Sequence, residues 1–429
     1  MAGTTGRRAA PSHEPAPDAL RPVRPTRAEW ALLALALLLR LWLVAHATWL
    51  PVSDTRDYHD LARSLASGQG YVQVYEGERP EYRGLAFHAF RMPGYPAFLV
   101  ALYSLFGWDP IVGYAANVAC DIGTQLLLLA LGRRLLGHAG SVAAQALFAI
   151  HLVWTPSLMT ESLFTLLFTV LVLMLVLGHP TASPRGAAGF GLLLTVALFV
   201  RPIAVAVLPV VLGRALRVRP ARRGALLAAL ALAPVVLGLA AWTARNHARL
   251  GSVVILTTNL GAHNAPFFGI DRARIVEDSR RQGLNEAAIN DTLVAEIGRA
   301  VVASPAWAVG LYARRAIALF SLGRPWEVRA LLATRTFAAS GSRGAHRAYG
   351  FLLFQYYLTY PLALAGAVLL ARERRPLRGV WAVLGSYVLA HAVVSDGNFR
   401  LAAPLYPLLC LFAGHGIAWI GAQRGWWTD

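Results

Sequence analysis

Three acidic residues lie within two helical turns near the start of the chain. The stretch SDTRDYHDLARSLASGQGY covers residues 53–71 and contains Asp54, Asp57 and Asp60. On a helix, Asp54 and Tyr58 share one face and Asp57 lies beside them. A carboxylate in such a place can act as a general base or as a metal ligand. The alternative is structural, because Ser53 and Asp54 are also good N-cap residues for a surface helix.

Isolated polar residues elsewhere interrupt apolar sequence, and we expect them on the same side of a membrane. They are Arg91 in FRMPGYP, Glu161 in LMTESLF, Arg201 in FVRPIA, Arg245 and Asn246 in WTARNHARLG, and Arg400 in SDGNFRLAAP. Fixed guanidinium groups match a phosphate through paired hydrogen bonds. Any one of these residues can instead be an interfacial side chain that reaches toward water. Together they predict a site of carboxylates and arginines for an anionic ligand.

Arg40 and Asp121 need a separate explanation, because both lie inside apolar runs. Ionisable residues within a membrane are costly and are usually paired or functional. Both stand roughly 8–11 positions from the outer ends of their runs, which is about 12–16 Å along a helix. We expect a structural ion pair between them, with a lipid-binding role as the alternative.

The elements that carry these residues are long apolar runs. The chain of 429 residues is 56% hydrophobic and has a mean hydropathy of +0.50. Runs of this length predict transmembrane helices. The expected fold class is therefore an all-α, multi-pass membrane protein. Its ten expected spans are 30–50, 112–132, 139–155, 158–178, two short helices within 187–216 that meet at Arg201–Pro202, 224–243, 350–371, 379–395 and 401–420.

The remaining segments divide into a tail and two long loops. Residues 1–29 are rich in Pro, Ala and Arg and predict a disordered cytoplasmic tail ahead of a transmembrane domain at 30–429. Residues 51–110 form a first external loop with a helical start, and residues 244–348 form a long external loop. Within the second loop, 286–303 and 306–321 are amphipathic, so we expect them on the membrane surface.

The basic charge follows the pattern of membrane orientation. The formal net charge is +18, and all 40 basic residues are arginines. They concentrate in the tail and in the short gaps GRR, SPRG, GRALRVRPARRG, RERRPLRG and QRG, which the positive-inside rule places in the cytoplasm. Membrane orientation thus explains the charge better than a nucleic-acid partner does. The 2 cysteines lie in apolar runs, which argues against a disulfide framework or a zinc–thiolate site.

Taken in order along the chain, these motifs resemble those of the GT-C glycosyltransferases. They are most similar to bacterial members related to protein O-mannosyltransferases and lipid A aminoarabinose transferases. The resemblance covers nearly the whole chain from residue 30 onward. It includes D-x-x-x-Y…A-x-x-L-x-x-G-x-G-Y, here from Asp54 to Tyr71, and then RMPGYP, LFG, LGRRLLG, TESLF, RP, RNHARLGSVVILTTNLGAHN and FRLAAPLYP.

The resemblance implies a membrane enzyme that transfers a hexose or pentose from a polyprenyl-phosphate donor to an acceptor hydroxyl. It places the protein in the bacterial inner membrane, with the active site on the external, periplasmic face and without the C-terminal soluble domain of some relatives. The acceptor would be a protein, a lipid or a polysaccharide. The family's catalytic acid corresponds to Asp54, and its phosphate-facing basic positions to Arg201, Arg245 and Arg400. The other expected site residues are the carboxylates Asp57 and Glu161 and the substrate contacts Tyr58, Arg91 and Asn246.

The chemistry of such a transfer fits these residue types. A lipid phosphate leaves as a stabilised anion, so the general acid that glycosidases need is not required. One carboxylate to deprotonate the acceptor and arginines to bind the phosphate are sufficient, and a single displacement would invert the sugar. Many members have a second acid where this chain has Thr55, which argues against a metal-binding or base role that depends on an acidic pair there. The metal requirement itself is open, with a divalent metal as one alternative. The competing functions are a flippase or transporter for lipid-linked sugars and a catalytically silent scaffold.

Overall fold

The computed structural model describes residues 24–49, 53–76, 79–321, 334, 339–373, 378–395 and 399–425. The predicted tail therefore lies outside the described residues up to residue 23. Helix α1 (Arg27–His46) already includes residues 27–29, and Thr26 and Glu29 form a reciprocal capping box at its start. Within the predicted long loop 244–348, residues 322–333 and 335–338 also lie outside the described residues.

The described chain is built almost entirely from helices. After α1 come α2 (Ser53–Ala66), α3 (Gly94–Phe106), α4 (Pro110–Ala149), α5 (Glu161–Val176), α6 (His179–Ala182), α7 (Pro184–Val200), α8 (Leu208–Ala215), α9 (Ala221–Leu250), α10 (Leu260–Asn264), α11 (Arg272–Arg281), α12 (Glu286–Ala303), α13 (Pro305–Ala318), α16 (Gly341–Arg372), α17 (Arg378–Val394) and α18 (Tyr406–Gln423). Short 3₁₀ turns are η2 (Pro80–Tyr82), η3 (Pro202–Val207), η4 (Ala265–Phe268) and η6 (Phe399–Leu405). Two short strands, β1 (Gln73–Val74) and β2 (Ala86–Phe87), pair antiparallel between α2 and α3.

These helices make the chain an all-α, multi-pass membrane protein, as predicted. Five described helices are long and apolar enough to cross a membrane: α1, α4, α9, α16 from His346, and α18 with the turn before it. A sixth span results if α12 and α13, which meet at a bend of 112°, are counted together. Shorter apolar helices, including α3, α5, α7 and α17, complete the bundle. The count of ten spans stays a prediction.

Two expected helix ends are corrected by the structure. The ranges 112–132 and 139–155 lie in two arms of α4, which are separated by a sharp bend at Gly137, where φ is 80°, as the two predicted helices require. The arms fold back on each other, because a Cβ atom added at Gly132 would lie 3.0 Å from the Cα atom of Ser141. The second arm ends at Ala149, before the predicted end at 155. Helix α9 continues beyond the predicted end at 243 as far as Leu250, because ARNHARL is polar but rich in strong helix formers. The long polar segment therefore begins after α9.

Close helix crossings hold the bundle together where small residues meet. Helix α18 packs against α4 and α16. A Cβ atom added at Gly366 on α16 would lie 1.7 Å from the carbonyl oxygen of Phe412, and one at Gly414 would lie 2.4 Å from that of Gly140 on α4. Small residues allow such approach between membrane helices, where van der Waals packing is the main attraction. These crossings fix α18 and the turn η6 directly before it.

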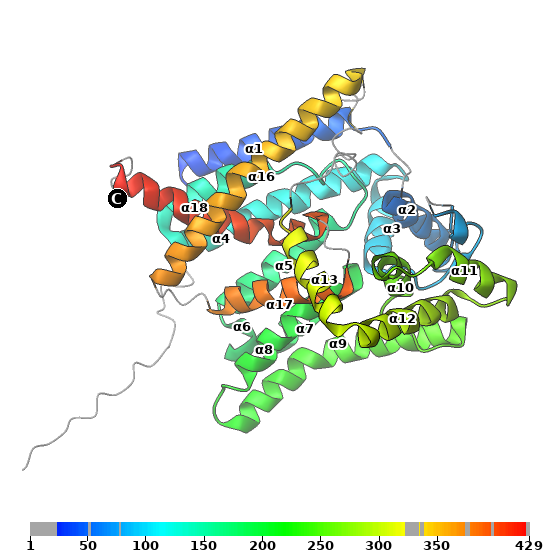
Figure 1. Cartoon of the computed structure of the whole chain (residues 1–429). Coiled ribbons are helices and arrows are strands. Elements are labelled where there is room, and N and C mark those ends of the chain that lie inside the picture. Colours follow the sequence, from blue (N-terminus) through cyan, green and yellow to red (C-terminus); the bar gives the residue numbers. More distant parts are fainter. Residues whose placement is uncertain are drawn as a thin grey trace, which may run out of the picture.

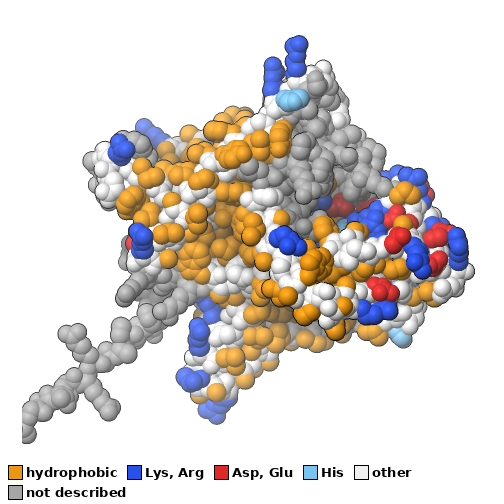
Figure 2. All heavy atoms as spheres, viewed as in Figure 1, with side chains coloured by type: hydrophobic (Ala, Val, Ile, Leu, Met, Phe, Trp, Pro, Cys, Tyr) orange, Lys and Arg blue, Asp and Glu red, His pale blue; other side chains and the backbone are white. Residues whose placement is uncertain are grey.

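Polar elements gather at one end of the bundle. In Figure 1, α2, α10, α11 and α12 lie together at the end of the molecule opposite the C end. Acidic and basic side chains are mixed over this end, whereas hydrophobic side chains cover the face formed by α16 and α18 (Figure 2). A small aromatic core of Tyr75, Tyr82, Phe87 and Phe90 joins the strand pair to α11 and α12. The polar end therefore has its own packing and rests on the apolar bundle.

Candidate functional site

A continuous row of acidic and basic side chains runs through the polar end of the bundle. At its centre, one carboxylate oxygen of Asp54 accepts a hydrogen bond from Arg91 Nη2, and the other lies 2.7 Å from Arg400 Nη1. On one side, Arg91 Nη2 also lies 2.9 Å from Asp57 Oδ2. On the other side, Glu161 Oε1 accepts from Arg400 Nε and lies 3.4 Å from Arg201 Nη1. We call these six residues, in the order Asp57, Arg91, Asp54, Arg400, Glu161 and Arg201, the charge chain.

Most members of the charge chain lie at the ends of helices or in the first turns of α2. Asp54 and Asp57 lie on α2, and Glu161 is the first residue of α5, where the helix dipole favours an acid. Arg201 follows the last residue of α7, because Pro202 cannot continue the helix. Arg400 lies on η6, directly before α18.

A tight contact at Gly94 brings Arg91 close to the end of α7. A Cβ atom at Gly94 would lie 2.6 Å from the backbone carbon and oxygen of Phe199, so no larger residue fits without moving one of the two segments. Arg91 precedes this contact by three residues, and Arg201 follows it by two. The glycine of the RMPGYP motif thus helps to bring the two arginines to one site.

The charge chain borders a cavity of about 390 Å³. Asp54, Arg91, Arg201 and Arg400 all line it, and so does Tyr58, whose ring lies 5.5 Å from the guanidinium carbon of Arg91. Apolar residues from η3 and α17, such as Ile203 and Val394, cover another part of its wall. A cavity that is charged on one side and apolar on the other suits an amphiphilic ligand with an anionic group.

The ionisation of Asp54 and Asp57 is set by their neighbours. Burial alone would raise the pKa of Asp54, but the charges of Arg91 and Arg400 outweigh burial and hold this pKa well below its usual range. Burial raises the pKa of Asp57, and the neighbouring Asp54 carboxylate adds to the shift although Arg91 opposes it. Asp54 is therefore the carboxylate of this pair that stays ionised.

Comparisons with known proteins identify the fold that carries this site. No family model and no curated protein sequence matches the chain. The apo crystal structure of the Archaeoglobus fulgidus oligosaccharyltransferase matches with a TM-score of 0.54 and 12% identity, over 92% of this chain and 51% of that chain. The A. fulgidus oligosaccharyltransferase AglB, solved with an inhibitory peptide and a dolichol-phosphate, matches with a TM-score of 0.50 and 12% identity over the same shares. The chain has the GT-C fold.

The extent of the match limits what it establishes. The chain spans about half the length of the oligosaccharyltransferases that it matches. ArnT from Cupriavidus metallidurans, solved with undecaprenyl phosphate, matches over 92% of this chain and 79% of that chain at 13% identity. The TM-score of this match is 0.39. At these identities the comparison confirms the predicted resemblance at the level of the GT-C fold.

Four predicted site residues do not line the cavity. Asp57 and Glu161 belong to the charge chain but lie outside the cavity wall, and the other two are Arg245 and Asn246. Arg245 Nη1 and Nη2 donate to the backbone oxygens of His88 and Tyr71, at 2.6 and 2.7 Å. The Asn246 amide donates to the backbone oxygen of Val254 at 2.9 Å. Both residues lie on the last turns of α9, because that helix continues beyond its predicted end. They tie the segment that holds Tyr71 and His88 to α9 and lie outside the cavity wall that includes Arg201 and Arg400.

Several residues of the site, in the cavity wall or in contact with the charge chain, were not among the predicted ones. Gln73 on β1 donates to Asp57 Oδ1 at 2.7 Å and so fixes that carboxylate. His263 on α10 lines the cavity and lies 3.0 Å from Arg79 Nη2; its burial and the charges of Arg79 and Arg91 hold its pKa well below the usual value. Asn259 and His391 also line the cavity. The sequence signal for His263 is its place in the NLGAHN motif, whereas Gln73 and His391 have no distinctive pattern.

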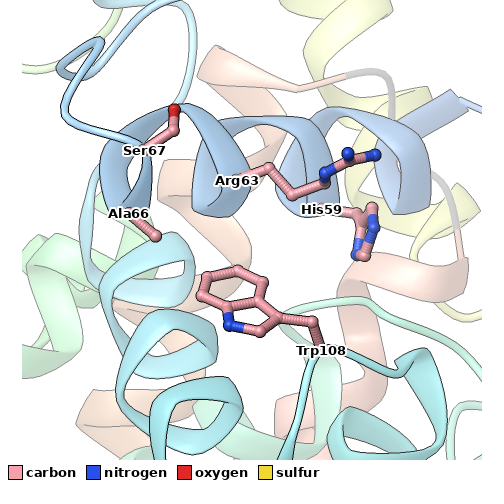
Figure 3. Close-up of a pocket in the computed structure, with 5 residues that line it drawn as sticks. All are labelled: His59, Arg63, Ala66, Ser67 and Trp108. Atoms are coloured by element: carbon pink, nitrogen blue, oxygen red, sulfur yellow. The ribbon is translucent and has the colours of Figure 1, made fainter.

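A second cavity lies on the opposite face of α2. It measures about 560 Å³ and is lined by His59, Arg63, Ala66, Ser67 and Trp108 (Figure 3). These α2 residues recur at helical spacing on the face away from Asp54 and Tyr58. Among the described residues, no carboxylate belongs to its wall. The second cavity is therefore separate from the charge chain.

The carboxylates of the charge chain do not form a divalent-metal site. Both oxygens of Asp54 are paired with guanidinium groups, and Asp57 and Glu161 also accept from arginines. A cation at Asp54 would have to displace these arginines and would face their positive charge. Within the described residues, no group of three or more His, Cys, Asp or Glu has an arrangement that could hold a metal ion.

Proposed function

We propose that the chain is a membrane glycosyltransferase. It takes a sugar from a polyprenyl-phosphate donor and transfers it to an acceptor hydroxyl. The observation that carries this proposal is the cavity of about 390 Å³ that Asp54, Arg201 and Arg400 share. The fold adds support, because one matching structure was solved with a dolichol-phosphate bound.

Arg201 is the residue best prepared to bind the donor phosphate. Its guanidinium makes one long hydrogen bond within the described residues, at 3.4 Å to Glu161, and stacks over Phe164 at 5.7 Å. A guanidinium has five N–H donors, so most of those on Arg201 are available to a ligand. Paired hydrogen bonds from one guanidinium to a phosphate are both strong and directional.

Arg400 couples phosphate binding to the activation of Asp54. In the structure it is shared between Asp54 and Glu161. A phosphate beside Arg201 would compete with Asp54 for this guanidinium. As Arg400 turns to the phosphate, Asp54 loses a positive neighbour and becomes a stronger base. The donor would therefore bind before Asp54 is fully competent.

The transfer itself needs one base and no general acid. Asp54 takes the proton of the acceptor hydroxyl while the acceptor oxygen forms a bond to the anomeric carbon. The bond from that carbon to the phosphate oxygen breaks, and the electron pair leaves with the phosphate. Arg201 and Arg400 stabilise the charge that develops there. Attack opposite the leaving phosphate inverts the anomeric configuration.

Asp57 and Glu161 serve this reaction by positioning arginines. Asp57 fixes Arg91 and is itself held by Gln73. Glu161 contacts both Arg201 and Arg400 through the same oxygen. We assign Tyr58, Arg91, Arg201 and Arg400 to the substrate cavity, and we assign Arg245 and Asn246 to the support of its outer wall.

We place the site on the external face of a bacterial inner membrane. The arginine-rich turn between α8 and α9 and the C end lie away from α2, the helix that carries Asp54 (Figure 1), as the positive-inside rule would require. A reporter fused after residue 218 should then be cytoplasmic, and one near residue 275 should be external. A reporter near residue 275 that is found in the cytoplasm would show that the chain has the opposite orientation.

The test of the proposed function is transfer by the purified chain in liposomes. The donors are polyprenyl phosphates that carry radiolabelled mannose, glucose or arabinose, and the acceptor is a membrane extract. The expected result is that label moves from the lipid to an acceptor and polyprenyl phosphate is released. Label that crosses the bilayer while still attached to its lipid would instead support a flippase. Neither result with any donor would support a silent scaffold.

A further inference from the structure

His391 is a buried histidine in the cavity wall that has no role in the mechanism above. It lies on the last turn of α17, lines the same cavity as Arg201 and is 4% exposed. Its ring stacks against Tyr387, with 4.7 Å between centroids. Within the described residues, its Nε2 atom has no hydrogen-bond partner. A buried polar atom without a partner is costly, so a ligand group is the natural partner for this one.

The contacts of Ser395 determine which nitrogen of the His391 ring carries the proton. The Ser395 hydroxyl donates its single hydrogen to the backbone oxygen of His391 at 2.8 Å. The same hydroxyl oxygen lies 3.0 Å from His391 Nδ1 and can there only accept. Nδ1 is therefore the protonated nitrogen. In the neutral ring with a proton on Nδ1, Nε2 is the acceptor, and no group in the described part of the chain donates to it.

Because Nε2 of His391 is an acceptor, the ligand group that faces it must be a hydrogen-bond donor. A phosphate oxygen would oppose the lone pair of Nε2, because both groups are acceptors. A hydroxyl can donate to Nε2 and would satisfy it. Arg201, whose charge acts on the ring, is the residue that we expect to hold the donor phosphate. The sugar attached to that phosphate is thus the nearest source of hydroxyl groups.

We propose that His391 Nε2 accepts a hydrogen bond from a hydroxyl of the donor sugar, and that Ser395 holds the ring in the required tautomer. This inference rests on the proposed function. It makes His391 a specificity residue, because a site that hydrogen-bonds a substrate hydroxyl rejects analogues that lack it.

The test compares binding of two lipids to the purified full-length chain in nanodiscs. The probes are polyprenyl phosphate alone and the same lipid carrying mannose, glucose or arabinose. Wild type should bind at least one sugar-bearing lipid more tightly than the bare lipid phosphate. In His391→Asn, the amide nitrogen can replace Nδ1 as a donor to Ser395, but nothing replaces Nε2. This variant should lose about 3- to 10-fold in affinity for the sugar-bearing lipid and keep its affinity for the bare lipid.

Two further variants separate recognition from stability. His391→Gln can place an amide oxygen near the position of Nε2 and should retain part of the preference for the sugar. Ser395→Ala leaves the ring free to change tautomer and should lower the preference by about 2-fold. With a donor that lacks the contacting hydroxyl, His391→Asn and wild type should bind equally. A purely structural role of His391 would not produce this dependence on one hydroxyl.

Each failure of this test has a distinct meaning. A wild type that binds polyprenyl phosphate but prefers no sugar-bearing lipid would overturn the role of His391 and leave the phosphate site in place. That role is also overturned if His391→Asn still binds the sugar-bearing lipid as much more tightly than the bare lipid as wild type does. This holds even if the variant has lost transfer activity. A wild type that binds neither lipid would overturn the proposed function. If His391→Asn does not fold, Ser395→Ala and the deoxy donors decide the outcome.

Discussion

The Arg40–Asp121 pair and the charge chain are two buried groups of ions that differ in how fully their hydrogen-bonding capacity is used. Arg40 is 0% exposed, and its Nε donates to Asp121 at 3.1 Å, as the sequence predicted. Asp121 also accepts from Thr155 at 2.6 Å. The other donors of Arg40 meet the backbone oxygens of Ala36, Ala149, Phe148 and His151 at 2.9–3.3 Å. Arg40 is thus saturated and has nothing left to offer a ligand.

The charge chain is less deeply buried, with arginine side chains that are 12–20% exposed, and its hydrogen bonding is incomplete. Arg201 makes one long hydrogen bond within the described residues, and one oxygen of Glu161 has no partner there. The arginines and Asp54 of this incomplete group border a cavity of about 390 Å³, whereas the space beside Asp121, which Glu161 also lines, measures about 10 Å³. A saturated buried ion pair serves structure, and an unsaturated one beside a cavity is able to bind. Four predictions test this distinction.

The largest effect is expected from Asp54→Asn. Asparagine keeps the size of the side chain but cannot take a proton, so transfer should fall about 10²–10⁴-fold. Labelled transfer in membranes matched for protein level measures the loss. Asp60→Asn is the control, because Asp60 lies on the same helix and forms its ion pair with the half-exposed Arg56, at 3.4 Å. Near-normal transfer by Asp54→Asn, with Asp57→Asn or Glu161→Gln inactive, would move the base to another carboxylate.

A large loss of stability is expected from Asp121→Leu. The substitution leaves the buried Arg40 guanidinium without its counter-ion, which should cost about 3–5 kcal/mol of unfolding free energy. Arg40→Leu combined with Asp121→Leu removes both charges and should recover part of this loss. Folded yield and thermal unfolding in detergent report both effects. A double variant no more stable than the worse single variant would mean that the pair is not energetically coupled.

A smaller effect is expected from Arg201→Lys. Lysine keeps the positive charge but loses the planar pair of donors, so affinity for polyprenyl phosphate should fall about 10-fold or more. Arg245→Lys is the matched control, because Arg245 donates to the backbone oxygens of His88 and Tyr71 and does not line the cavity. It should lower thermal stability and leave lipid affinity within about 2-fold. The assignment of Arg201 fails if the two variants exchange these phenotypes.

The smallest effect concerns pH. Arg91 and Arg400 hold the pKa of Asp54 well below its usual range, so its ionisation stabilises the fold above the unfolded pKa. That contribution is lost as pH falls through the folded pKa. Arg91→Gln should raise this pKa and move the acid limb of kcat/KM upward by about one pH unit. An unchanged acid limb in a folded variant would show that Asp54 does not govern it.

The sequence predicted those helices whose position follows from the length of a run of apolar residues. The predicted ranges near α1, α5, α7, α17 and α18 correspond to helices, because each is a run of apolar residues with a clear terminating signal such as Pro202. The continuation of α9 was missed because the sequence was divided by polarity. Helical hydrogen bonding continues through polar residues wherever the tertiary structure satisfies their side chains, as it does for Arg245.

The sequence by itself determined which residues carry charge in an apolar protein and at which ends of the helices they stand. It thereby predicted Asp54, Arg201, Arg400 and the Arg40–Asp121 pair, since apolar runs and their interruptions are local properties. Only the tertiary structure decided that Arg400 joins Asp54 to Glu161, that Arg245 binds backbone oxygens and that His391 faces the cavity. These relations join residues far apart in the sequence. They depend on how helices cross at glycines such as Gly94 and Gly366, and no local pattern encodes that packing.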